Sequence, residues 1–180
     1  MNPCILTASG RYFDFIDPSV RDIHITDIAR ALSRICRFTG HTAQFYSVAQ
    51  HSVLVSHVVP KRFALEGLLH DASEAYLGDV SSPLKQLLPD YRDIERRVED
   101  AIRLKFRLSS SAADSVKDAD LRLLVTEKRD IMPYPRFAEL DRDADAWVWT
   151  NEFSPLEHSI VPVGPDEAYD LFINRYLELT

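Results

Sequence analysis

Apolar residues recur at intervals of three and four along most of this chain, the spacing of one face of an α-helix. The first run, Ile25, Ile28, Leu32 and Ile35, predicts a helix from Ile25 to about Cys36. The same pattern predicts further helices over 46–59, 61–77 and 89–107, from just after Ser109–Ser111 to about 132, and from Gly164–Pro165 onward.

Two stretches depart from this pattern. Residues 4–15 alternate weakly between apolar and polar and carry Ser9-Gly10 between two apolar pairs, which predicts a β-hairpin. Residues 141–163 are acidic, then aromatic and proline-bearing, with Trp147 and Trp149, and this composition favours a loop with a short helix. The predicted fold class is therefore all-α, a helical bundle with a small N-terminal hairpin.

A length of 180 residues and a hydrophobic content of 46% suit one domain with a sizeable core. Within the domain 1–180 we expect a hairpin segment at 1–20, a helical core at 25–132, and a C-terminal segment and helix at 133–180.

Charge and cysteine content narrow the class of partner. The formal net charge is -7, from 28 acidic and 21 basic residues, which argues against duplex nucleic acid as a partner because phosphate binding needs a basic field. Cys4 and Cys36 form no CxxC motif. Since we see neither a signal peptide nor an apolar run long enough for a bilayer, we expect a cytoplasmic protein without a membrane partner. A small-molecule ligand remains possible, and we expect a homo-oligomer.

The stretch from Leu68 to Asp79 places polar side chains at the end of an apolar helix. His70 and Asp71 are adjacent. Glu74 follows four residues after His70 and three after Asp71, so all three project toward roughly one side of a helix. Burying that much charge is costly unless it is paired or bound to a metal. Taken alone, the stretch is equally compatible with a capped helix end whose Asp and Glu are solvated.

Two other predicted helices supply partners for this pair. His51 lies beside the buried stripe of the 46–59 helix, and Asp120 lies in the core-facing register of the helix that ends near 132. Two imidazoles and two carboxylates suit Mn, Fe, Co, Ni or Zn. They also leave coordination positions for water and substrate, as a catalytic site requires.

The order His51, His70-Asp71, Asp120 resembles the H…HD…D pattern of the HD-domain metal-dependent phosphohydrolases. Within that superfamily the chain is similar to the YfbR-type 5'-deoxynucleotidases and to the phage-type deoxyadenosine triphosphohydrolases, over about residues 28–130. The motifs that carry this resemblance are Ser47–Ser52, His70–Glu74, Leu77–Asp79, Pro83–Lys85 and Val116–Asp120.

The resemblance implies an HD-domain fold and roles for particular residues. One divalent metal per chain would be held by His51, His70, Asp71 and Asp120, with Mg possible together with substrate phosphates. Glu74 would orient or deprotonate the attacking water, and Asp79 would act as a second acid/base group.

The resemblance also implies residues that contact the substrate. Arg37 matches the family's arginine and would clamp the phosphate. Phe38 stands where the family has tryptophan; it can stack on a sugar or base but lacks the indole N–H. Lys85 is a further phosphate candidate or a solvated lysine, and His41 either touches the substrate or is a hydrogen-bonded loop histidine.

The function we expect is hydrolysis of the 5'-phosphate ester of deoxynucleotides, from monophosphate to deoxynucleoside and phosphate. One alternative is a deoxynucleoside triphosphate triphosphohydrolase that releases the whole phosphate chain. Another is a regulatory HD module that binds a nucleotide without turning it over. The presence of both Glu74 and Asp79 favours an enzyme, because a module without turnover needs neither.

Overall fold

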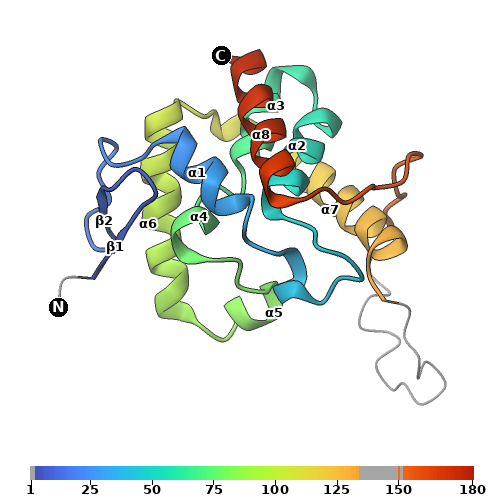
Figure 1. Ribbon diagram of the computed structural model, residues 1–180, viewed down its shortest axis with the longest axis horizontal. Coiled ribbons are helices and arrows are strands. Elements are labelled where there is room, and N and C mark those ends of the chain that lie inside the picture. The colour runs from blue at the N-terminus through green and yellow to red at the C-terminus, as the bar shows by residue number, and fades with distance from the viewer. Residues whose placement is uncertain (1–2, 134–149, 151) are drawn as a thin grey trace.

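The computed structural model describes residues 3–133, 150 and 152–180. This part of the chain is mostly helical with one small antiparallel sheet, which confirms the mainly-α prediction (Figure 1). Its elements are β1 (Cys4–Leu6), β2 (Tyr12–Asp14), α1 (Ile25–Leu32), η1 (Arg37–Gly40), α2 (Val48–Val58), η2 (Lys61–Phe63), α3 (Ala64–Leu69), α4 (Glu74–Leu77), α5 (Ser82–Lys85), α6 (Pro89–Phe106), η3 (Ser110–Ala112), α7 (Ala113–Asp130) and α8 (Pro165–Leu179), where η marks a 3-10 helix.

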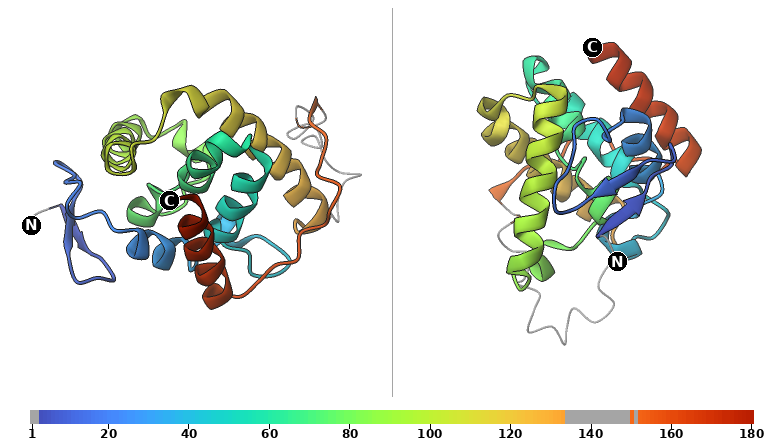
Figure 2. Two further views of the ribbon diagram at one scale, coloured as in Figure 1. Left: turned by 90° about the horizontal axis from the view of Figure 1, so that it is seen from above. Right: turned by 90° about the vertical axis from the view of Figure 1, so that its left-hand side faces the viewer.

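The predicted hairpin is present and is tied to the helices beside it (Figure 2). Its turn is held because both the N–H and the hydroxyl of Ser9 donate to the buried carboxylate of Asp27 in α1, each at 2.7 Å. From β2, Phe13 stacks on Tyr76 of α4 with ring centroids 4.0 Å apart. The hairpin therefore covers one end of the core.

The predicted continuous helix over 61–77 is wrong. The chain instead forms η2, α3 and α4, with His70–Ser73 in a turn between the last two. In this turn Ala72 N–H donates to the carbonyl of Leu69, a bond that spans three residues rather than four. His70 contributes to the break, because its Nδ1 donates to the carbonyl of Gly67, which an unbroken helix would reserve for a backbone N–H.

Three other predicted boundaries need comment. Helix α1 ends at Leu32 rather than near 36, and Ser33 donates its hydroxyl to the carbonyl of Arg30 at that end. Helix α5, Ser82–Lys85, lies between two predicted helices in a stretch for which the apolar pattern predicts no element. Of the loop and short helix expected at 141–163, residues 141–149 and 151, including Trp147 and Trp149, lie outside the described residues.

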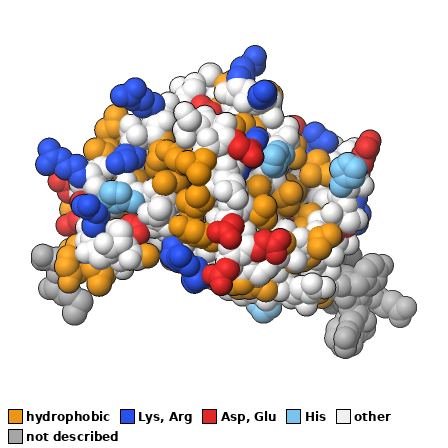
Figure 3. Space-filling model, turned by 45° about the horizontal axis from the view of Figure 1, so that its top comes forward, with side chains coloured by type: hydrophobic (Ala, Val, Ile, Leu, Met, Phe, Trp, Pro, Cys, Tyr) orange, Lys and Arg blue, Asp and Glu red, His pale blue; other side chains and the backbone are white. Residues whose placement is uncertain are grey.

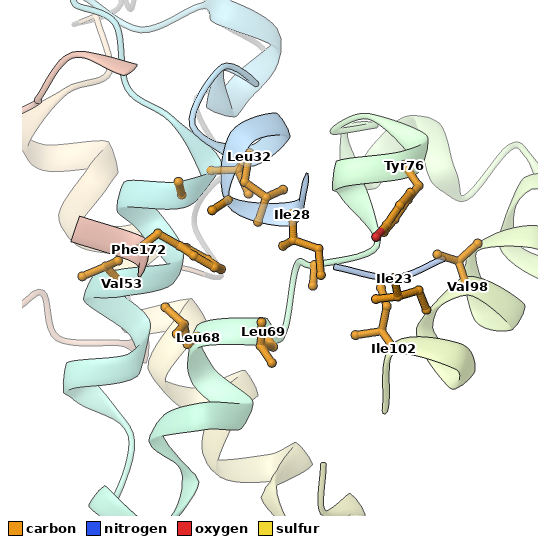
Figure 4. Close-up of a cluster of buried hydrophobic side chains, with 14 of the residues drawn as sticks. Ile23, Ile28, Leu32, Val53, Leu68, Leu69, Tyr76, Val98, Ile102 and Phe172 are labelled. Carbon is orange, nitrogen blue, oxygen red and sulfur yellow. The ribbon is translucent and has the colours of Figure 1, made fainter. Parts of the chain in front are cut away.

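The core is built where α1, α2, α3 and α8 meet, and it extends to α4 and α6 (Figure 4). Each large apolar side chain buried there contributes about 1.5–3 kcal/mol. The labelled side chains are Ile23 ahead of α1, Ile28 and Leu32 of α1, Val53 of α2, Leu68 and Leu69 of α3, Tyr76 of α4, Val98 and Ile102 of α6, and Phe172 of α8.

Helix α7 joins this core through a second apolar cluster. Val55 and Val59 of α2 pack there with Ala119 and Leu123 of α7. The segment before α8 is hydrogen-bonded to the same two helices. Gln50 of α2 donates to the carbonyl of Val161, and Arg129 of α7 donates to the carbonyl of Leu156. Helices α2 and α7 are thus held in fixed relation.

Helices α2 and α3 approach closely at Gly67. A Cβ at this position would lie 2.9 Å from Val59 Cγ2 and 3.1 Å from the backbone Cα of Ser56. Any larger residue would push the two helices apart. Because α2 carries His51 and α3 leads into His70, this glycine also sets how near the two imidazoles come.

The surface shows mixed charge. On the face in Figure 3, apolar patches alternate with basic and acidic side chains, and the acidic ones gather near the lower middle. None of the helices in the described part of the chain combines the length and apolar content needed to cross a bilayer. The cytoplasmic location and the homo-oligomer stay predictions.

The close approach at Gly67 leads to a stability prediction. Overpacking should cost about 1–3 kcal/mol, against a gain of about 1 kcal/mol from alanine's better helix propensity. Since the obstructing Ser56 atom is backbone, we expect the steric cost to win. Gly67→Ala should lower the free energy of unfolding by on the order of 1 kcal/mol in chemical denaturation.

The matched control is Gly164→Ser. A Cβ at Gly164 meets nothing within 4 Å, and serine suits the N-cap position that Gly164 occupies before α8. This variant should be as stable as the wild type or more so. Equal stability of Gly67→Ala and the wild type would show that the α2–α3 contact is not tight.

Candidate metal site

Three parts of the fold bring the predicted ligands together. His51 lies in α2, His70 and Asp71 lie in the turn after α3, and Asp120 lies in α7. One ligand atom each from His51, His70 and Asp120 lies within 4.8 Å of the other two, a group that could hold a metal ion. His51 Nε2 is 3.1 Å from Asp120 Oδ1 and 3.3 Å from His70 Nε2.

Asp71, the fourth predicted ligand, borders the same cluster. Its Oδ2 lies 3.2 Å from His70 Nε2 and 3.6 Å from His51 Nε2. Exposure differs across the set: the His51 side chain is fully buried, whereas that of Asp120 is 37% exposed. The cluster is therefore closed on the α2 side and open toward α7.

Both imidazoles are oriented by a hydrogen bond through the nitrogen that faces away from the cluster. His51 Nδ1 donates to Glu127 Oε1 at 2.6 Å, and His70 Nδ1 donates to the carbonyl of Gly67 at 2.8 Å. A carbonyl can only accept, so the proton of a neutral His70 is on Nδ1 and its Nε2 presents a lone pair. Metal-binding histidines are oriented in this way by a carboxylate or a backbone carbonyl.

These bonds make a cation favourable between the rings. With both Nδ1 atoms donating, two Nε2 lone pairs face each other at 3.3 Å with carboxylate oxygens beside them. Such an arrangement is repulsive unless positive charge lies within it, either a metal ion or, without one, a proton on His51 Nε2, which the raised pKa of His51 favours. The residues present therefore fit a divalent metal, and two imidazoles with carboxylates suit the ions Mn to Zn.

The pKa shifts have the same electrostatic origin. Burial and Arg37 act to lower the pKa of His51, but Glu127 and Asp120 outweigh them and raise it to about 9. Burial acts to raise the pKa of Asp71, yet the neighbouring His70, His51 and Arg37 hold it well below the usual range. The cluster favours ionised carboxylates and a positive partner.

Glu127 is a site residue that sequence reasoning missed. Its carboxylate is completely buried and joins two groups, accepting from His51 Nδ1 through one oxygen and from Arg37 Nη2 at 3.0 Å through the other. It lies seven residues after Asp120, two helical turns along the same face of α7. That spacing was the available signal, but without a known partner it does not separate Glu127 from a solvated glutamate.

Arg37, the predicted phosphate clamp, lies inside this network. Its Nη1 is 3.5 Å from Asp71 Oδ2, its Nη2 bonds Glu127, and its side chain is only 13% exposed. Among the described residues, its buried Nε has no hydrogen-bond partner. One N–H group is therefore available for another ligand.

Glu74 and Asp79, the predicted acid/base pair, lie on the α4 side of the cluster. Glu74 is buried, and its Oε2 has no hydrogen-bond partner among the described residues. Burial, together with Asp71 and Asp79, raises the pKa of Glu74 to about 9 despite Arg37 and Lys85. Burial also raises the pKa of Asp79, although Arg37 acts against it.

Lys85 of α5 is bound to carboxylates rather than solvated. Its Nζ lies 2.6 Å from Glu95 Oε1 of α6 and 3.9 Å from Glu74 Oε1. Glu95 is a second residue that sequence reasoning missed, because it reads as one of many charges on the exposed face of an amphipathic helix. Any phosphate at Lys85 must compete with Glu95.

Phe38 and His41 belong to the η1 turn beside Arg37. Phe38 and Thr39 have positive φ angles of 54° and 55°, costly for residues with side chains and especially for a β-branched threonine. The guanidinium of Arg37 lies 5.3 Å from the centre of the Phe38 ring. His41 is exposed at the end of the turn, where its backbone N–H donates to the carbonyl of Phe38.

Comparison with known proteins gives relatives without an assigned activity. The chain is 44% identical over 177 residues to the uncharacterized protein YfdR of Escherichia coli K12, covering 98% of this chain and 95% of that protein. It is 37% identical over 121 residues, 62% of each chain, to an uncharacterized protein of Rhodobacter capsulatus. No family model matches the chain. These relatives therefore assign no reaction to the residues of the site.

Glu127 provides a test of the metal site. Glu127→Gln keeps the side-chain size but removes the charge that orients His51 and pairs with Arg37. We expect metal affinity to fall about 10- to 100-fold, the usual effect of losing a partner that orients a ligand. Affinity is measured by metal titration against a competing chelator. Asp118→Asn, an exposed carboxylate on the same helix, is the control and should bind metal like the wild type.

Glu74 provides a pH test. Its pKa is about 9 in the folded protein and near 4.5 unfolded, so between these values the folded chain keeps a proton that the unfolded chain loses. The contribution of Glu74 to the free energy of unfolding is therefore fully present below about pH 4.5 and is lost as pH rises toward 9. In chelator, Glu74→Gln should gain stability over the wild type as pH rises, by at most about 1.4 kcal/mol per pH unit.

The comparison is made by thermal or chemical unfolding at several pH values from 5 to 9. Glu157→Gln, at an exposed position, is the control and should follow the wild type at each pH. A stability difference between Glu74→Gln and the wild type that does not change with pH would contradict the raised pKa.

Proposed function

The chain belongs to the family of the Escherichia coli protein YfdR, and we propose that it is an HD-domain phosphohydrolase that cleaves the 5'-phosphate ester of deoxynucleotides with the help of a divalent metal. The observation that carries this proposal is the convergence of His51, His70 and Asp120 within 4.8 Å. The order of these ligands in the sequence and their resemblance to the HD-domain enzymes support the choice of reaction.

The proposed metal site consists of His51, His70, Asp71 and Asp120. A divalent metal bound there would lower the pKa of a coordinated water and polarise the phosphoryl oxygens. The partial exposure of Asp120 supports access for a substrate phosphate from the α7 side.

In this proposal Arg37 binds the phosphate and Glu74 binds the attacking water. The unpartnered Nε–H of Arg37 donates to a phosphate oxygen, while its two outer nitrogens remain on Asp71 and Glu127. A cation bound at Asp71 would lower the pKa of Glu74 and leave it ionised, because the charge of Asp71 is one cause of the raised value. The unpartnered Oε2 of the Glu74 carboxylate then accepts a hydrogen bond from the attacking water and takes its proton. The water oxygen forms the new bond to phosphorus.

Asp79 acts on the leaving group. As the bond from phosphorus to the 5'-oxygen breaks, that oxygen leaves with the electron pair and takes a proton from Asp79. Burial raises the pKa of Asp79, which favours its protonated form more than in an exposed aspartate. Phe38, beside Arg37, packs against the sugar, where a 2'-hydroxyl would lose its hydrogen bonds to water at a cost of about 1–3 kcal/mol.

The decisive experiment measures phosphate release from matched mono- and triphosphates of ribo- and deoxyribonucleosides with Mn, Co and Mg. We expect hydrolysis of deoxynucleoside monophosphates in the presence of a transition metal. Release of an intact triphosphate would instead identify a triphosphohydrolase. Nucleotide binding without turnover of any substrate would identify a regulatory module and would falsify the proposed function.

Two variants separate the residue roles. Asp71→Ala should lose both metal and turnover, whereas Glu74→Gln should keep metal and nucleotide binding and lose turnover by roughly 10²–10⁴-fold. Metal content is measured by elemental analysis. Glu157→Gln again serves as the control. Near-normal turnover in Glu74→Gln would remove Glu74 from the mechanism.

A further inference from the structure

A cavity of about 290 Å³ opens directly onto the metal ligands, and none of the predicted substrate residues lines it. Its walls come from α3, α6, η3 and the first half of α7, and His70 and Asp120 are among the residues that line it. Arg37, Phe38, His41 and Lys85 do not border it. The structure thus has a space beside the proposed metal site that none of the roles proposed for Arg37, Glu74 and Asp79 uses.

The size and walls of the cavity suit a flat, mostly apolar group. Its volume is near the lower end of the roughly 300–1,000 Å³ typical of ligand pockets, enough for part of a nucleotide. Leu69, Ile102 and Val116 provide apolar walls. Such walls favour the faces of an aromatic ring over a hydrated phosphate.

The polar groups at the cavity offer both donors and acceptors. Glu66 and Glu99 face it, and Glu66 is fixed by accepting the N–H of Ser109 at 3.0 Å. Arg103 also lines it, and among the described residues no hydrogen bond or ion pair involves the Arg103 guanidinium. Lys117 lines the cavity too, so its lining mixes cationic with anionic side chains. A neutral ring with amino, imino and carbonyl groups can use both kinds of partner.

We propose that this cavity seats the nucleobase of the substrate while the 5'-phosphate lies at the cluster of His51, His70 and Asp120. The inference rests on the proposed function, because it assumes that the phosphate is bound by those residues. In the sequence, α6 showed only an amphipathic pattern. In this arrangement Glu99 and Arg103 of α6 contact the base and select it.

The test fills the cavity without touching the catalytic residues. Ala113→Phe adds a ring at an exposed position on the rim, and Val116→Phe adds one at a half-buried wall position. Asp118→Phe adds the same bulk at an exposed position of α7 that does not line the cavity and is the control. Two substrates are compared, a deoxynucleoside 5'-monophosphate and 2-deoxyribose 5-phosphate, which lacks the base.

We expect both cavity variants to raise KM for the nucleotide by about tenfold or more, equivalent to about 1.4 kcal/mol of lost binding. Their activity on 2-deoxyribose 5-phosphate should match the wild type, and Asp118→Phe should leave both substrates unaffected. If nucleotide KM stays at the wild-type value in both cavity variants, the base lies elsewhere, although the proposed function would stand.

A second measurement does not depend on hydrolysis. Calorimetry of the four free deoxynucleosides in chelator tests the base seat alone. Binding to the wild type that is lost in both cavity variants supports the inference even if no phosphate is ever released. Absence of binding to the wild type, together with equal turnover of the nucleotide and the base-free ester, would overturn it.

Discussion

The approach of two imidazole Nε2 atoms to 3.3 Å is the constraint on which the rest of this structure depends. Two neutral rings do not hold this geometry unaided, because their lone pairs repel. The fold imposes it through the tight packing of α2 on α3 at Gly67 and through one hydrogen bond to each Nδ1. Gly67 serves both purposes, since its missing side chain lets the helices meet and its carbonyl orients His70.

The same constraint explains why so much charge is buried behind the cluster. Glu127 orients His51, but a completely buried carboxylate is costly unless it is paired and fully hydrogen-bonded. Arg37 supplies the pairing from η1, and the positive φ angles of the next two residues are the strain of keeping that turn in place. A backbone distortion in one loop is thus connected to the orientation of a ligand on another helix.

The two faces of the cluster are chemically different, and this difference organises the proposed function. On the α4 side lie Glu74 and Asp79, carboxyls with raised pKa values that are suited to proton transfer. On the α6–α7 side lies a cavity lined by both apolar and charged side chains. A phosphate ester bound between them would have its water and proton donors on one side and space for its organic part on the other.

The sequence by itself determined the helices, the hairpin and the identity of the candidate ligands. Local periodicity and turn residues carry that information within a few neighbouring positions, and the ligands stand out because imidazoles and carboxylates interrupt apolar faces. Tertiary structure alone decided the break after α3, since it depends on where the His70 ring finds an acceptor. The roles of Glu127, Glu95 and the cavity were also beyond the sequence. Each is defined by partners on other helices, and Glu127 lies 76 residues from its partner His51. An isolated glutamate on an amphipathic helix gives no sign of which side chain it will contact.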